Sequence, residues 1–210
     1  MLTEQLIDDL TEKMQSVTPA PAPIWLFLKW GVGTMAYIAV ALGFMGVRPD
    51  IMEKLHSPLF AVEIAVLSGI IASSLFAAAL LAFPDMYQRQ KTIWLPALMF
   101  LLFAAVLLME FYADNPPAPL PPHTAECLLC ISLLSLVPGA FILYGIRKFA
   151  STHYYMAGKV TTLAAFSIGA LALRLSEPTD SMRHLVEWHY LPMLGAAVAG
   201  LFLGKLCLKW

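Results

Sequence analysis

The sequence predicts an all-α, polytopic membrane protein: a bundle of six transmembrane helices with both termini in the cytoplasm. Composition is the first indication, since 60% of the 210 residues are hydrophobic and 13% are charged, with a mean hydropathy of +0.74. Soluble domains have roughly half apolar and a quarter charged residues. Length is the second, because six apolar stretches each reach about the ~20 residues that a helix needs to cross a bilayer. These stretches are apolar on all sides, whereas transmembrane strands alternate.

The predicted spans leave little of the chain outside the membrane. They cover residues 24–47, 58–83, 92–112, 127–145, 159–175 and 187–206. Residues 24–210 therefore form one transmembrane domain. Residues 1–20, followed by a Pro-rich tether to about residue 23, form a soluble leader. The leader is acidic and the first apolar stretch is long, without a signal-peptide cleavage pattern, so we expect the first span to remain as an anchor.

Orientation follows from the distribution of Lys and Arg, which are enriched in cytoplasmic loops. With the N-terminus inside, the cytoplasmic side receives nine of these residues and the outer side four. The cytoplasmic set is Lys13, Lys29, Arg89, Lys91, Arg147, Lys148, Lys159, Lys205 and Lys209, and the outer set is Arg48, Lys54, Arg174 and Arg183. The third loop, residues 113–126, carries neither Lys nor Arg and is rich in proline, which supports a periplasmic location.

The leader has the pattern of an amphipathic helix. Its apolar residues recur at steps of three and four, which places them on one face. They are Leu2, Leu6, Ile7, Leu10 and Met14, with the acids Glu4, Asp8, Asp9 and Glu12 between them. A helix lying on the membrane is one interpretation. However, membrane-surface helices are usually rich in Lys and Arg, and this leader has four acids against one Lys, so a basic protein partner fits better.

Cys127 and Cys130 form a C-x-x-C motif at the start of the fourth span, on the predicted periplasmic side, while Cys207 lies at the opposite end. Three interpretations remain open: small apolar packing residues, a redox pair, or part of a metal site. The metal interpretation adds His123, four residues before Cys127, and His184 or His189 across the bundle. The spacing alone does not choose between them.

Charged residues in or beside the spans, including Glu63, Glu110 and Arg174, lie mostly within a turn or two of a span end. There they can reach the interface, so we interpret them as structural. The middle of each span is chiefly Ala, Leu, Gly and Phe in uninterrupted helices, which does not favour transport. The chain also lacks the common catalytic motifs, so we expect neither enzymatic activity nor a cofactor.

Four segments in order along the chain carry a family resemblance. They are residues 2–10 with the Thr-Pro-rich tether, Gly-Val-Arg-Pro-Asp at 46–50, Cys-Leu-Leu-Cys-Ile-Ser-Leu-Leu-Ser-Leu-Val-Pro at 127–138, and Gly-Lys-Leu-Cys-Leu-Lys-Trp at 204–210. Together they resemble the NrsF family of six-span anti-sigma factors in the bacterial inner membrane. The resemblance runs over the whole chain, and the order and spacing of the segments make it specific.

The resemblance implies that the leader binds a cytoplasmic sigma factor of the extracytoplasmic-function (ECF) type, and that envelope, metal or oxidative stress releases it. A basic partner suits an acidic leader, because sigma factors carry positive surfaces for promoter DNA. The chain itself would contact no nucleic acid. The family tends to have one cysteine opening the fourth span and another after the fifth. Cys127 matches the first, but residues 174–181 contain neither Cys nor His, so any thiol sensor must use Cys127 with Cys130, one thiol alone, or an intermolecular pair.

The main hypothesis is therefore a membrane-bound anti-sigma factor without enzymatic activity. Two alternatives come from other classes: a membrane thiol oxidoreductase that uses Cys127 and Cys130, and a small transporter or channel. The first requires a redox-active cysteine pair. The second requires a water-accessible cavity or broken helices at mid-membrane.

Overall fold

The computed structural model describes residues 3–12, 19–84, 91–113 and 125–209. In that part of the chain the regular elements are helices: α1 (Thr3–Glu12), α2 (Pro23–Met45), α3 (Ile51–His56), α4 (Pro58–Leu81), α5 (Leu95–Ala113), α6 (Ala125–Arg147), α7 (Tyr154–Ser176), α8 (Met182–His184), the π-helix η2 (Leu185–Tyr190) and α9 (Leu191–Leu208). Six segments are long and apolar enough to cross a membrane, the last of them running continuously over Met182–Leu208. The all-α class and the number of spans are confirmed.

Two spans begin earlier in the chain than the sequence predicted. The fifth and sixth were expected from residues 159 and 187, but their helices begin at Tyr154 and Met182. The first turns of these helices carry aromatic and charged residues that lower local hydropathy without breaking the helix, as is usual at a membrane interface. At the start of each of these two spans, the helix therefore extends beyond its apolar stretch.

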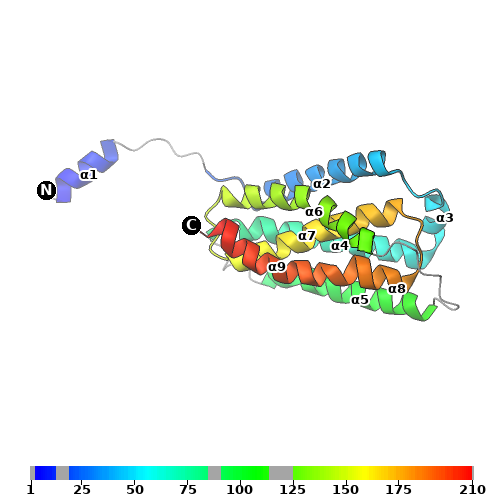
Figure 1. Ribbon diagram of the computed structural model, residues 1–210. Helices are drawn as coiled ribbons and strands as arrows, with labels where there is room; N and C mark the ends of the chain where they lie inside the picture. Colours follow the sequence, from blue (N-terminus) through cyan, green and yellow to red (C-terminus); the bar gives the residue numbers. More distant parts are fainter. Residues whose placement is uncertain (1–2, 13–18, 85–90, 114–124, 210) are drawn as a thin grey trace.

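The spanning helices form a bundle with α7 at its centre, in contact with α2, α4, α6 and α9 (Figure 1). Of the six spans, α7 is the most buried, whereas α5 and α2 expose large apolar side chains such as Leu101 and Phe44. The start of α2 and the end of α9 lie at one end of the bundle, which we call the C-terminal end. The opposite end, which we call the α3 end, contains α3, the start of α6 and the loop of residues 177–181 (Figure 1).

Close packing of α7 against α9 depends on glycine. A Cβ at Gly158 would collide with the Gly200 carbonyl oxygen, and one at Gly204 would collide with the Tyr154 carbonyl oxygen. Gly200 and Gly204 are four residues apart on α9, the small-x-x-x-small spacing that lets membrane helices approach closely. Because helices in lipid gain little from hydrophobic burial, we expect this backbone contact to contribute to bundle stability.

Pro138 lies inside α6 and has no N–H to donate to the Leu134 carbonyl one turn earlier. The Tyr37 hydroxyl of α2 donates to that carbonyl at 2.8 Å. A backbone group left without its helical partner is thus satisfied by a neighbouring helix, which is how membrane bundles tolerate proline.

The sixth span contains the π-helix η2 between α8 and α9, a local feature that was not predicted from the sequence. The Leu191 N–H bonds to the Val186 carbonyl, five residues back, which is the π-helical pattern. Pro192 follows directly at the start of α9, and its ring disfavours a regular α-helical turn before it. The span stays continuous, but its side chains are rotated relative to those of an α-helix.

Candidate functional site

Two buried charges at the α3 end pair with each other across the bundle. Arg174 of α7 donates to Glu63 of α4, with Nε–Oε1 and Nη2–Oε2 distances of 3.0 Å each. The Tyr190 hydroxyl of η2 donates to the same carboxylate, and the Phe60 ring lies 4.7 Å from the Arg174 guanidinium. Arg174 and Glu63 were interpreted from the sequence as structural charges within reach of the interface. The structure places them inside the bundle as a pair, which is the condition for burying charge in an apolar environment.

A second set of charges joins the α2–α3 connection to the loop of residues 177–181. Arg48 is buried and donates to both oxygens of Asp50 at 2.8 Å. Its guanidinium also contacts Asp180 at 3.3 Å, while Lys54 contacts the same carboxylate at 2.6 Å. Asp180 further accepts from Arg174 at 3.2 Å, so it connects this set to the buried pair.

The pKa values in this network indicate that its acidic and basic groups are ionised. The hydrogen bond from Arg48 is the largest cause that lowers the pKa of Asp50 to about 2. Burial raises the pKa of Asp180, but the hydrogen bond from Lys54 and the charges of Arg48 and Arg174 outweigh it and leave a lowered pKa. The bond to Asp50 raises the pKa of Arg48. Both aspartates are therefore charged at neutral pH.

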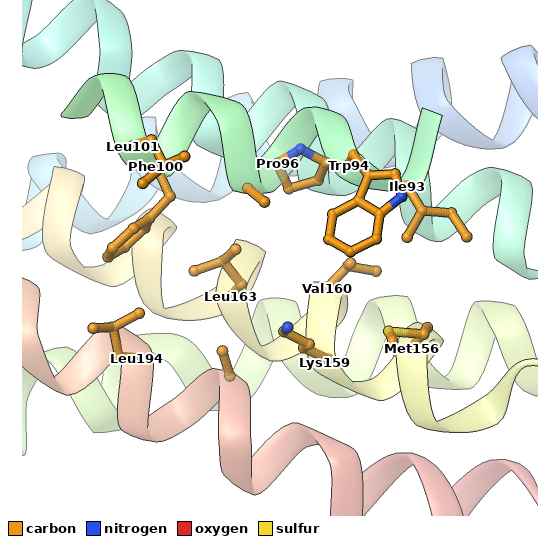
Figure 2. A pocket seen from close by; sticks show the side chains of 12 residues that line it. Ile93, Trp94, Pro96, Phe100, Leu101, Met156, Lys159, Val160, Leu163 and Leu194 are labelled. Carbon is orange, nitrogen blue, oxygen red and sulfur yellow. The ribbon is translucent and has the colours of Figure 1, made fainter. Parts of the chain in front are cut away.

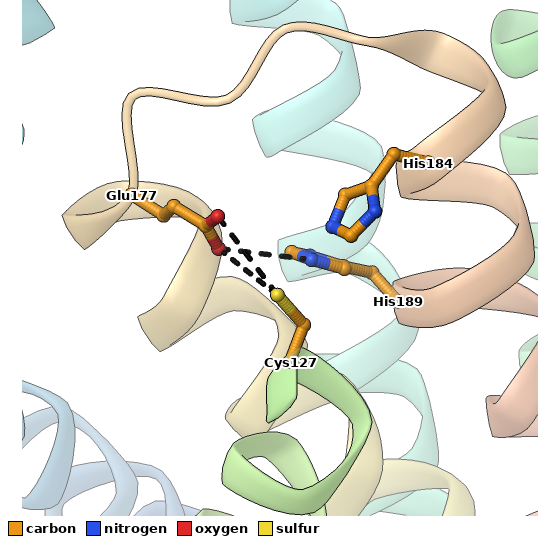
Figure 3. A group of neighbouring side chains, drawn as sticks. All are labelled: Cys127, Glu177, His184 and His189. Carbon is orange, nitrogen blue, oxygen red and sulfur yellow. Dashed lines mark hydrogen bonds and ion pairs between the residues drawn. The ribbon is translucent and has the colours of Figure 1, made fainter. Parts of the chain in front are cut away.

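A thiol, a carboxylate and two imidazoles lie close together at the start of the same loop, which itself supplies the carboxylate of Glu177 (Figure 3). Cys127 at the start of α6 donates to Glu177 through Sγ, at 3.5 Å from Oε2. His189 Nε2 lies 3.9 Å from Glu177 Oε2, and the rings of His184 and His189 are 5.1 Å apart. One ligand atom from each of the four lies within 4.8 Å of the others. We call these four residues the Cys–Glu–His cluster.

The π-helix is what places both histidines in the cluster. Residues five apart on an α-helix lie about 140° apart around its axis, since each residue turns by about 100°. The wider turns of η2 reduce that angle and bring His184 and His189 to the same side. Neither ring is exposed to solvent, and both point toward Cys127 and Glu177 (Figure 3).

Of the residues proposed from sequence for a metal site, the structure brings Cys127, His184 and His189 together. His123 lies outside the described residues. Sequence reasoning missed Glu177. The sequence did contain a signal for it, because Glu177 is the first acid after the fifth span and lies at the end of the bundle where Cys127 begins the fourth span. Cys130 is half-buried and carries a free thiol, as does Cys207 at the C-terminal end.

The predicted leader helix is present as α1, which lies outside the six-helix bundle (Figure 1). Glu4, Asp8 and Glu12 are exposed, and Ile7 is 54% exposed. Leu2 and Met14 lie outside the described residues, as do the side chains of Leu6, Asp9 and Leu10. An exposed Ile beside exposed acids is an amphipathic surface available to a partner.

A pocket of about 350 Å³ lies between α5, α7 and α9, toward the C-terminal end (Figure 2). Its lining is apolar, with Trp94, Phe100 and Leu163 among the residues that form it, and Lys159 is the one charged residue among the described residues that line it. Such a lining suits lipid chains and offers a hydrated ion little replacement for its water, so it does not favour the transport alternative.

Fold and site together define a multi-pass membrane protein with an acidic amphipathic helix outside the bundle. Comparison with known proteins identifies the family within this class. The profile of the NrsF family, described as negative regulator of sigma F, matches residues 10–210, and the chain belongs to that family.

Two named relatives match over their full length. One is the probable anti-sigma-F factor NrsF of Azospira oryzae, 28% identical over 225 residues, with 100% of each chain covered. The other is the anti-sigma-F factor NrsF of Caulobacter vibrioides, 27% identical over 220 residues, again with 100% of each chain covered. No solved structure matches the chain.

Proposed function

We propose that this chain is an anti-sigma factor of the bacterial inner membrane that holds an ECF sigma factor in the cytoplasm through α1. The observation that carries the proposal is α1 itself: it lies outside the bundle and exposes both its acids and the apolar Ile7. Two relatives over the full length are named anti-sigma-F factors, which supports the same partner class. The protein acts by binding, and no enzymatic step is required.

The chemistry of α1 suits a sigma factor better than a lipid surface. Apolar contacts supply affinity once buried, at roughly 25 cal/mol per Å² of apolar area. The acids face a partner that carries positive charge for DNA binding and would repel the anionic inner leaflet. A basic protein surface can bury the apolar face of the helix and pair with its acids.

The Lys and Arg distribution supports an orientation with both termini and the C-terminal end of the bundle in the cytoplasm. The α3 end, with the Cys–Glu–His cluster, then faces the periplasm. Envelope, metal or oxidative stress would act there through Cys127 or Cys130, and the bundle would carry the change to α1. Such coupling requires two states of the bundle, with signal and sigma factor each favouring a different one.

Deletion of residues 1–20 tests the binding segment. The full-length chain and the truncated chain are each co-expressed with the sigma-F-type factor of the same bacterium, solubilised from membranes and captured through a C-terminal tag. Equal recovery of the two chains in the membrane fraction is the control for insertion. We expect the sigma factor only with the full-length chain, and undiminished capture by the truncated chain would overturn the proposal.

A further inference from the structure

We infer that Cys127, Glu177, His184 and His189 form a binding site for one divalent d-block metal ion of the zinc type. The ligands come from three separate parts of the chain: the start of α6, the loop after α7, and the α8–η2 segment. This inference concerns metal binding alone and does not depend on α1 or on a sigma factor.

The geometry is close to that of a tetrahedral site. Zinc binds thiolate sulfur at ~2.3 Å and imidazole nitrogen or carboxylate oxygen at ~2.0–2.2 Å, so neighbouring ligand atoms of a regular tetrahedron are separated by about 3.4 Å. The four ligand atoms lie within 4.8 Å of one another, and Cys127 Sγ is already 3.5 Å from Glu177 Oε2. Small side-chain rotations that bring the two histidines toward Cys127 Sγ and Glu177 Oε2 complete the site.

The histidines supply a second, independent observation. His184 and His189 are both fully buried, and neither ring nitrogen of either residue has a hydrogen-bond partner within the described structure. Buried polar groups in proteins are nearly always satisfied, and each exception requires an explanation. A metal ion between the two rings satisfies one nitrogen of each, since a neutral imidazole ligates through its unprotonated nitrogen.

The ligand set selects the class of metal. One thiolate, two imidazoles and one carboxylate suit Zn²⁺ and its spectroscopic substitute Co²⁺, whereas Ca²⁺ and Mg²⁺ prefer all-oxygen ligands. Binding displaces the proton of the Cys127 thiol, which leaves as H⁺ while a sulfur–metal bond forms. The thiolate and the Glu177 carboxylate then cancel the charge of the ion, so the occupied site is neutral. The Glu177 side chain is 25% exposed and gives the ion a route from solvent.

Cobalt substitution tests the site in the full-length protein. The protein is purified in detergent, treated with a chelator and titrated with Co²⁺, and Zn²⁺ is then added as a competitor. We expect one Co²⁺ per chain, with the visible bands of a tetrahedral ion and a thiolate-to-cobalt charge-transfer band, both abolished by Zn²⁺. Absence of a stoichiometric charge-transfer band would overturn the inference.

Matched variants identify the ligands. C127S should lose the charge-transfer band, while C130S and C207S should keep it. H189Q should weaken Co²⁺ binding at least about tenfold, the lower end of the loss seen when even an outer-shell partner is removed. If C127S does not fold, as judged by its melting curve in chelator, E177Q at the exposed edge of the site provides the same test through affinity. An unchanged band in C127S, or unchanged affinity in both H189Q and E177Q, would contradict the assignment.

Discussion

Arg174 of α7 and Glu63 of α4 form an ion pair inside the bundle, with an Nε–Oε1 distance of 3.0 Å and side-chain exposures of 5% and 0%. The pair joins the central helix to α4 near the α3 end. Asp180 and the Thr179 carbonyl also accept hydrogen bonds from Arg174, at 3.2 and 2.7 Å, so the same guanidinium fixes the loop of residues 177–181. Glu177 begins that loop, and the buried pair thereby helps to position the Cys–Glu–His cluster.

Removing one partner of this pair should destabilise the bundle strongly. R174Q leaves the Glu63 carboxylate buried without its counter-charge, which typically costs about 3–5 kcal/mol. Thermal unfolding in detergent measures the effect. R183Q is the matched control, because Arg183 pairs with Glu187 on the surface, at side-chain exposures of 68% and 48%, and exposed pairs contribute about 0–1 kcal/mol. Equal melting temperatures for the two variants would contradict a stabilising role for the buried pair.

Acid should weaken the contact between Arg48 and Asp50. The pKa of Asp50 is lowered to about 2, so the stability it contributes is fully present above the unfolded-state pKa of about 3.9 and is lost as pH falls through about 2. We expect D50N to melt below the wild type at pH 7, and the difference to shrink between about pH 4 and pH 2. E53Q, which alters an exposed acid on α3, should show no comparable trend. A difference between D50N and wild type that is constant with pH would contradict the ion pair.

The α7–α9 contact should tolerate no side chain at Gly158. G158A places a methyl group against the Gly200 carbonyl oxygen, and forced overpacking of this kind typically costs about 1–3 kcal/mol. G195A on α9 is the matched control, since a Cβ there has no atom within 4 Å and the gain in helix propensity is shared by both variants. The melting temperature of G158A should fall below that of G195A. If G158A melts at or above G195A, the close backbone contact is not a source of stability.

The hydrogen bond from Tyr37 to the Leu134 carbonyl should be measurable in isolation. Y37F removes the hydroxyl and leaves a carbonyl already deprived of its helical partner by Pro138, at a cost of about 1–3 kcal/mol. Y144F, on an exposed tyrosine of α6, serves as the control. Melting curves of the two variants that coincide would show that the bond does not stabilise α6.

Much of this fold follows directly from the sequence. Hydropathy defined all six spans, because the thickness of the bilayer fixes the length of a helix that crosses it. The 3.6-residue period defined α1 in the same way. Hydropathy failed at Tyr154 and Met182, where polar and aromatic interface residues extend a helix beyond its apolar part. It also gave no sign of the partner of Arg174, because pairing between α4 and α7 depends on how the helices are arranged in the bundle.

The Cys–Glu–His cluster was only partly predictable for a related reason. Cys127, His184 and His189 were identified as ligand types at the same predicted membrane face. Their convergence depends on η2, whose turns rotate His189 toward His184, and an α-helical reading of that segment places the two rings on different sides. Glu177 joins them through a loop held by Asp180, a tertiary contact that no local pattern encodes.

Binding of a sigma factor by α1 is tested most directly by a pair of point variants in that helix, because both leave the bundle intact. I7S removes an exposed apolar side chain from α1, and Q5S makes the same replacement on its polar face. Affinity of the purified full-length variants for the sigma-F-type factor is measured by titration in detergent. We expect I7S to bind at least about tenfold more weakly, since burying such a side chain is worth about 1.5–3 kcal/mol, and Q5S to bind as the wild type does. Equal affinities for I7S, Q5S and the wild type would contradict sigma-factor binding through the apolar face of α1.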